Sequence, residues 1–340
     1  MKRFIIKFLI LFAIIDGYLF WYRFFVYPNI SGDMGYLAKL PFGKAYNEQI
    51  VNSNKINGCY VSNIYSIDSI PVRRIVTIGD SFSQQDTLGY QQYLGHRIGD
   101  TIFNIPINNT ATHSPEQTFV RLVNRGLLDS TTNIVIIQSV ERSMLGRLSD
   151  LNFIDTTEVE LRKRPIKKTN SNPDYVGEAM HKMRLLLGYR RPILKYDLSK
   201  PLFTHPKYSK NIYIYHSPFI GDTDLNFPKD TLFVMRAYEN LEKLYAFATQ
   251  HSIRILYLIA PDKYDVYYPY ILNSPGYNMT LDFCPQNNFI VNPKTIFRRA
   301  LEENVQDVYY INDTHWSPIG SKIIGEEVAK RIKDLYLSQE

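Results

Sequence analysis

Two short segments, about 230 residues apart, hold the side chains best suited to chemistry. The first is RRIVTIGDSFS (73–83), where Ser81 follows a run of β-branched residues. Gly79 lets the chain turn sharply out of a strand. The Ser81 hydroxyl can then face a crevice while its own N–H faces a developing oxyanion. Taken alone, a serine in this position is more often a turn or helix N-cap residue than a nucleophile.

The second segment is YYINDTHWSPIGSK (309–322), which contains Asp313 and His315. On an extended segment, two residues apart, their side chains lie on one face. The carboxylate can accept the imidazole N–H, fix the tautomer and leave the other nitrogen as a base. A capping aspartate and a surface histidine would explain the same pair. Together with Ser81, however, the two residues make up a hydrolytic triad: Ser81 as nucleophile, His315 as base and Asp313 as its orienting carboxylate.

Metal chemistry and nucleic-acid binding are less consistent with the sequence. A divalent-metal hydrolase using Asp80, Asp313 and His315 is an alternative, but too few further ligands accompany these residues. The net charge of +6 comes from 39 basic and 33 acidic residues spread along 340 positions, which does not make a nucleic-acid footprint. We therefore expect no metal, no cofactor and no nucleic-acid partner.

Strands alternate with helices in the part of the chain that carries both segments. Apolar runs predict strands at 73–79, 101–105, 133–139 and 253–260. Helical spacing and capping residues predict helices at 89–98, 114–128, about 231–250 and from 317 onward. Such alternation indicates an α/β fold, a parallel sheet with helices on both faces. Ser81 then falls at the carboxyl ends of the strands, where open sheets bind ligands.

The N-terminus is typical of a membrane anchor, which we place at 1–28. Lys2, Arg3 and Lys7 precede the apolar run FLILFAIIDGYLFWY (8–22), so the start of the chain is expected in the cytoplasm. Asp16 costs about 2.5–3.5 kcal/mol on insertion scales unless a partner helix satisfies it. A cleavable signal peptide is the alternative, but no small-x-small cleavage site follows. Either interpretation exports the remainder, and the anchor predicts a single-pass protein of the inner (cytoplasmic) membrane.

The remaining chain divides into three parts. Residues 29–70 are interpreted as a stalk that merges into the domain edge, and 71–340 as the catalytic domain. Within it, 142–229 show little regular periodicity and are interpreted as an insertion or lid, whose basic run RKRPIKK (162–168) is typical of a solvated loop. Cys59 and Cys284 are the only cysteines, so one disulfide can form outside the cytoplasm.

At this point the motifs resemble those of the SGNH (GDSL-like) hydrolase superfamily, and most closely the group of periplasmic alginate O-acetylation proteins. The matching residues read GDSF at 79–82, DTHW at 313–316 and APDKYDVYYPY at 260–270, the last containing Lys263. The resemblance covers about 71–141 and 230–336. It implies a three-layer, SGNH-like (flavodoxin-like) sheet.

The sequence also departs from the family pattern. The superfamily donates oxyanion hydrogen bonds from a glycine in its second block and an asparagine in its third. Here Asn108 or Asn109 lies near the glycine position, and Glu141 and Arg142 follow the third strand. The Glu-Arg pair looks like that of the acetylation group, although a structural salt bridge explains it equally well. The oxyanion or substrate-binding candidates are thus Asn108, Asn109, Glu141, Arg142 and Lys263.

The alginate proteins also carry their Asp-x-His before the serine, whereas here it follows, so their substrate cannot be transferred. The resemblance and the anchor favour an exported O-acetyltransferase that acts on a polysaccharide through an acyl-serine. A multi-spanning membrane O-acyltransferase is the implied partner. A carbohydrate acetylesterase of the same fold and a catalytically silent polysaccharide-binding or assembly subunit are the alternatives.

Overall fold

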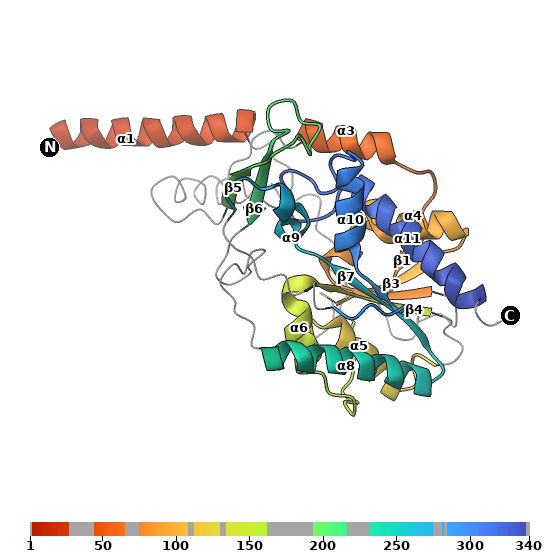
Figure 1. The fold of residues 1–340 in the computed structure, drawn as a ribbon. Coiled ribbons are helices and arrows are strands. Elements are labelled where there is room, and N and C mark those ends of the chain that lie inside the picture. The colour runs from red at the N-terminus through yellow and green to blue at the C-terminus, as the bar shows by residue number, and fades with distance from the viewer. Residues whose placement is uncertain are drawn as a thin grey trace.

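A six-stranded, all-parallel sheet forms the centre of the protein (Figure 1). The computed structural model describes residues 2–26, 44–64, 75–107, 112–129, 134–161, 193–215, 231–274, 281 and 284–337. The strand order is β1-β3-β2-β4-β7-β8. The strands are β1 (Val61–Asn63), β2 (Ile75–Gly79), β3 (Ile102–Pro106), β4 (Ile134–Val140), β7 (Arg254–Ala260) and β8 (Ile290–Val291).

The two central strands are apolar along their whole length because both faces of the sheet are covered. Every residue of β2 and β4 is buried. Successive side chains alternate between two cores, so that Ile75 packs in one and Val76 in the other. The four predicted strands are confirmed to within one or two residues, whereas β1 and β8 were not predicted.

Helices cover both faces, as the alternation predicted (Figure 1). One core includes side chains from α3 (Lys44–Asn54), α4 (Tyr90–Ile98), α10 (Pro293–Glu302) and α11 (Pro318–Leu337). The other includes side chains from α5 (Pro115–Asn124), α6 (Glu141–Ser149) and α8 (Thr231–Gln250). The predicted N-cap of α5 is confirmed, since Ser114 Oγ accepts the N–H of Gln117 at 3.2 Å. That helix ends at Asn124 and not at 128.

The order of the strands places a reversal at the centre of the sheet. Apart from the edge strand β1, the strands lie in the chain order second, first, third, fourth, fifth. The chain therefore leaves β2 toward β3 on one side and later continues with β4 on the other. Ligands bind open parallel sheets at the carboxyl ends next to such a reversal. Ser81 directly follows β2 at this point.

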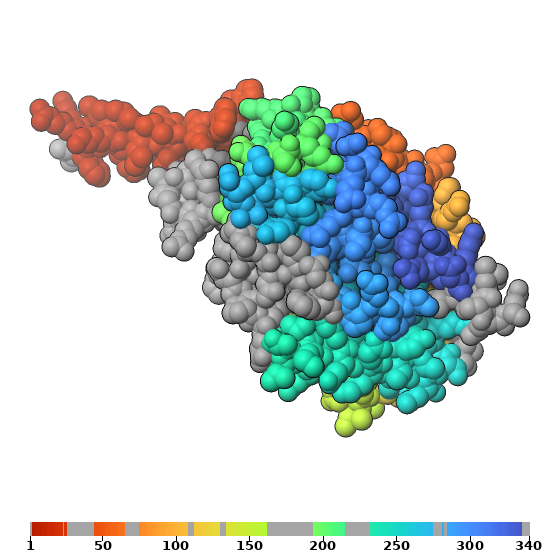
Figure 2. Space-filling view, viewed as in Figure 1, coloured from red at the N-terminus to blue at the C-terminus, as the bar shows by residue number. Residues whose placement is uncertain are grey.

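The segment 142–229 contains more regular structure than predicted. Most of α6 lies in it, and β5 (Ile193–Asp197) and β6 (Asn211–Tyr215) form an antiparallel hairpin. The residues that follow β5 pack on the segment containing α9 (Lys263–Tyr267), where Phe203 stacks on Tyr267 at 5.4 Å. The surfaces of the hairpin and of this segment adjoin in the space-filling view (Figure 2). The basic run 162–168 lies outside the described residues.

The N-terminal helix α1 (Lys2–Trp21) projects from the body of the protein (Figures 1 and 2). It is 20 residues long with a mean hydropathy of 2.0 and has no buried residue, so it is long and apolar enough to cross a membrane. The predicted stalk is partly structured, because α3 and β1 lie within 29–70 and join the domain.

The two cysteines are both free. Cys59 lies just before β1 and Cys284 shortly before β8, and these strands form opposite edges of the sheet. Five strand spacings separate the edges by roughly 24 Å. A disulfide needs Cα atoms within about 7 Å, so the fold keeps these two thiols apart.

Candidate functional site

The turn that follows β2 is packed too tightly for any residue but glycine at its start. A Cβ on Gly79 would lie 2.1 Å from Ser83 Oγ and 2.8 Å from Gln138 Oε1. The buried Ser83 hydroxyl itself donates to Gln138 Oε1 at 2.9 Å, which ties the turn to β4. Ser81 is the first residue of the 3₁₀ turn Ser81–Ser83 and is only half-buried, so its hydroxyl reaches the surface.

Asp80 fixes this turn from behind. Its side chain is buried, and Oδ2 accepts the N–H of Val140 at 2.8 Å and Arg147 Nη1 at 3.2 Å. Oδ1 accepts the N–H of Phe82 at 3.3 Å. Both carboxylate oxygens are therefore engaged by donors within the fold. This arrangement gives Asp80 a structural role and disfavours the alternative in which it binds a metal.

His315 is held by Asp313, as the spacing of the two residues predicted. Asp313 Oδ1 lies 2.6 Å from His315 Nδ1 and also accepts the backbone N–H of His315 at 2.9 Å. The segment bends at Thr314 and His315 and is not extended as predicted, so the carboxylate reaches both donors at once. A proton on Nδ1 makes Nε2 the nitrogen that can act as a base. Both side chains are largely covered, with exposed fractions of 23% for His315 and 18% for Asp313.

Aromatic packing brings the two motifs together. Phe82, next to Ser81, contacts the His315 ring at 4.9 Å and the Trp316 ring at 4.8 Å. Trp316 is fully buried and donates its Nε1–H to Tyr309 Oη at 3.0 Å. Gln85 Nε2 donates to the Trp316 carbonyl at 3.2 Å. The segment that follows β2 and the segment that precedes α11 thus form one packed unit.

One surface cavity contains all three predicted catalytic residues. It has a volume of about 330 Å³ and is lined by Ser81, Gln84, Gln85, Leu88, Tyr310, Asp313 and His315. The Ser81 hydroxyl makes no hydrogen bond within the described ranges of the chain, so the serine-histidine contact is not closed here. Such contacts are often long before a substrate binds. Residues 81 and 315 nevertheless open into the same space.

Lys263, predicted as an oxyanion or substrate-binding residue, is buried under the loop of residues 310–313 that lines the cavity. Its side chain is 1% exposed. Nζ donates to the carbonyls of Tyr310 at 2.6 Å, Ile311 at 3.0 Å and Asp313 at 3.3 Å. Three donors on three backbone carbonyls hold the loop that carries Asp313. The structure therefore places Lys263 behind the cavity, where it supports the loop of residues 310–313.

Glu141 and Arg142 both bind Asp262 and do not pair with each other as a salt bridge. Arg142 Nη1 donates to Asp262 Oδ1 at 2.6 Å, and Glu141 Oε2 accepts the Asp262 N–H at 3.0 Å. They join the carboxyl end of β4 to that of β7, and neither lines the Ser81 cavity. Burial, together with the nearby Asp265 and Asp262, raises the pKa of Glu141 well above its usual range.

Four residues of the cavity were not predicted, namely Gln84, Gln85, Leu88 and Tyr310. The two glutamines stand three and four residues after Ser81. A short turn after the serine would bring them next to it, and the sequence therefore contained a signal for their place in the cavity. Burial raises the pKa of Tyr310, which keeps its hydroxyl protonated as a donor. The predicted oxyanion candidates Asn108 and Asn109 lie outside the described residues.

Comparison of the chain with protein-family models, with curated proteins and with solved structures gives no match.

Proposed function

We propose that this protein is an exported, membrane-anchored O-acetyltransferase that acts on a polysaccharide through a Ser81-His315-Asp313 triad. One observation carries the proposal. Three residue types that together activate a serine, drawn from segments about 230 residues apart, line one cavity, and Asp313 lies 2.6 Å from His315 Nδ1. Packing alone does not require a carboxylate, an imidazole and a hydroxyl to share one opening.

The proposed reaction has two halves. Ser81 Oγ attacks the acetyl carbonyl while His315 Nε2 takes its proton, and the collapse of the tetrahedral intermediate expels the donor alcohol, protonated by His315. A sugar hydroxyl then gives its proton to His315 and attacks the acetyl-serine. Collapse of the second intermediate returns the proton to Ser81 Oγ. Asp313 stabilises the imidazolium in both halves.

The oxyanion needs at least two donors, of which the Ser81 N–H is one. Asn108 or Asn109 supplies the second in this proposal. The Tyr310 hydroxyl and the Gln84 amide, which line the cavity, are further donors of the right kind. Removing one such donor costs about 100- to 1000-fold in rate.

The SGNH (GDSL-like) resemblance supports the same assignment. GDSF lies at the carboxyl end of β2 and DTHW immediately before the last helix. The strand order, without β1, is the one found in flavodoxin-like sheets. Within the proposal, α1 anchors the protein in the inner membrane with Lys2 and Arg3 in the cytoplasm. The catalytic domain then lies outside that membrane, and a multi-spanning O-acyltransferase supplies acetyl groups.

The test separates transfer from hydrolysis. The purified protein is given p-nitrophenyl acetate with and without oligosaccharides, and acetylated sugar and free acetate are both quantified. Transfer predicts acetylated oligosaccharide that disappears with Ser81→Ala. Release of acetate with no acetylated acceptor would establish the acetylesterase, and no turnover above Ser81→Ala would favour the silent subunit.

A further inference from the structure

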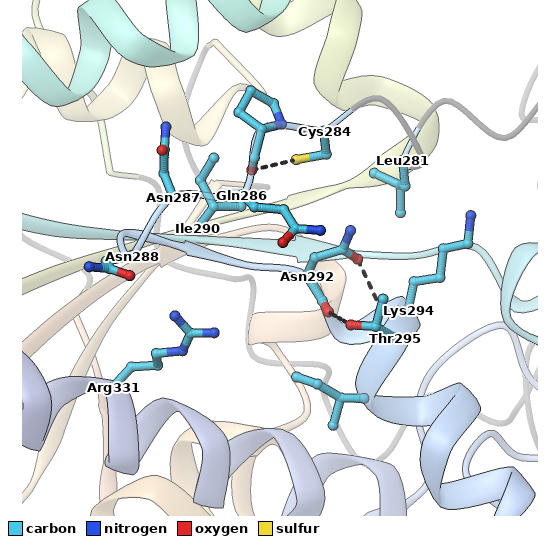
Figure 3. Close-up of a pocket in the computed structure, with 12 residues that line it drawn as sticks. Leu281, Cys284, Gln286, Asn287, Asn288, Ile290, Asn292, Lys294, Thr295 and Arg331 are labelled. Atoms are coloured by element: carbon cyan, nitrogen blue, oxygen red, sulfur yellow. Dashed lines mark hydrogen bonds between the residues drawn. The ribbon is translucent and has the colours of Figure 1, made fainter.

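A second cavity lies beside the edge strand β8 and shares no residue with the Ser81 cavity. Its volume is about 450 Å³. Three pieces of chain line most of it: residues 284–288, the first turn of α10, and Arg331 of α11 (Figure 3). In Figure 3, the side chains of Gln286 and Asn292 approach each other at the centre of the view, and Arg331 extends from α11 below them.

The lining of this cavity is unusually rich in side-chain amides: Gln286, Asn287, Asn288 and Asn292. Gln286 and Asn288 are exposed, and their amides make no hydrogen bond within the described portion of the chain. Arg331 donates Nε to Glu327 at 3.0 Å, and its two Nη groups make no hydrogen bond to another described residue. An amide offers both donors and acceptors, as a sugar hydroxyl does.

The charges of the cavity favour a hydroxyl-rich ligand over a polyphosphate. Lys294, the other cation in the lining, is 2% exposed in its side chain and is paired with Asp265 at 3.2 Å. Arg331 therefore offers one half-buried guanidinium among several neutral amides and the hydroxyl of Thr295. A nucleotide or polyphosphate site needs more positive charge than this.

The two cavities lie along the same sheet. One end of the β8 cavity, at Asn292 and Thr295, follows the carboxyl end of β8, just as Ser81 follows that of β2. Three strand spacings, from β2 through β4 and β7 to β8, separate the carboxyl ends of β2 and β8 by roughly 14 Å. An extended oligosaccharide is long enough to reach from one to the other.

We propose that the β8 cavity is a saccharide-binding subsite that holds a remote segment of the acceptor polymer while a hydroxyl of the same chain lies at Ser81. The polymer as occupant rests on the proposed function, whereas saccharide binding at this cavity can be measured without catalysis. Gln286 and Asn288 bind hydroxyls, and so does Nδ2 of Asn292, whose Oδ1 already accepts the N–H of Lys294 at 3.1 Å. Arg331 binds a ring oxygen, a hydroxyl or the carboxylate of an acidic sugar.

The test uses full-length Ser81→Ala protein in micelles of a detergent without a sugar headgroup, so that no probe is consumed. Saturation-transfer NMR titrations are run with maltotetraose, chitotetraose and tetragalacturonate. The double variant Gln286→Ala/Asn288→Ala is compared with Asn52→Ala, an exposed amide on α3 that contributes to neither cavity.

At least one probe is expected to bind, with an affinity that falls about tenfold in the double variant, the effect of losing two ordinary hydrogen bonds. Asn52→Ala should leave the affinity unchanged. Absence of saturation transfer from all three probes, or equal affinity in the double variant, would overturn the subsite. Binding that persists when Ser81 proves unreactive in wild-type protein would overturn the proposed function and leave the subsite standing.

Discussion

Replacing Lys263 by methionine should loosen the loop that carries Asp313. Methionine keeps the length of the buried stem but removes the donors to the carbonyls of Tyr310, Ile311 and Asp313. An unsatisfied buried acceptor costs about 1–3 kcal/mol, and removal of the desolvated ammonium offsets part of that cost. We expect the two shorter contacts to dominate and the free energy of unfolding to fall by about 2–4 kcal/mol.

The same change should also slow the reaction of Ser81 in molecules that remain folded, so the loss of rate exceeds what unfolding alone would cause. A displacement of the loop by 1 Å costs about 100-fold in rate, so Lys263→Met should react about 100-fold more slowly with a fluorophosphonate probe under conditions where it is fully folded. Urea unfolding is followed by the fluorescence of the buried Trp316, one of two tryptophans in the chain.

Lys200→Met is the matched control. Lys200 Nζ donates to a single carbonyl, that of Leu301 at 2.6 Å, and contacts neither Asp313 nor His315. The control should lose about 1 kcal/mol of stability and react at the wild-type rate. If Lys263→Met matched this control in both measurements, the assignment of Lys263 as the support of the Asp313 loop would be refuted.

Three further predictions concern groups that do not line the Ser81 cavity. The pKa of Glu141 is higher in the folded than in the unfolded protein, so its contribution to stability is present below about pH 4.5 and is lost as the pH rises toward the folded pKa. Replacing Glu141 by glutamine should therefore flatten the fall in unfolding free energy between pH 5 and 8. An unchanged dependence of the unfolding free energy on pH would contradict this. Gly79→Ala should destabilise the protein by about 1–3 kcal/mol in urea titrations, because the new Cβ meets the Ser83 hydroxyl; wild-type stability would show that the turn adapts freely. Burial raises the pKa of Cys284 to about 12, so maleimide at pH 7.5 should modify the exposed Cys59 much faster, as peptide mass spectrometry would show, and equal rates or a Cys59-Cys284 disulfide would contradict the fold.

The central layers of the fold were predictable because their sequence signals are local. The β-branched runs of β2 and β4 are buried on both faces, and the cap at Ser114 is formed by its own helix. The strands β1 and β8 have three and two residues, too few for any periodicity. The helix α10 did carry a signal, Asn292 as N-cap with Pro293 at its first position, which was overlooked.

The site likewise contains contacts that the local sequence predicts and contacts that depend on the fold. Asp313 and His315 interact across two residues, so sequence spacing alone predicted their pairing, and the sheet brings Ser81 to them. The roles of Glu141 and Arg142 depend on the approach of the carboxyl ends of β4 and β7. That of Lys263 depends on the loop before α11, whose carbonyls lie 47 or more residues away. Spacing in the sequence contains no information on such contacts, and the family resemblance alone made these residues oxyanion or substrate-binding candidates.

The proposed function depends most directly on whether Ser81 is a nucleophile activated by His315. The full-length protein is treated with a fluorophosphonate probe, and the modified peptide is identified by mass spectrometry in the wild type, Ser81→Ala and His315→Ala. Ser62→Ala, an exposed serine of β1, is the control. A Ser81 nucleophile activated by His315 predicts one modified residue, Ser81, with labelling abolished in Ser81→Ala, strongly reduced in His315→Ala and unchanged in Ser62→Ala. Absence of labelling in the wild type, or labelling that persists in Ser81→Ala, would contradict it.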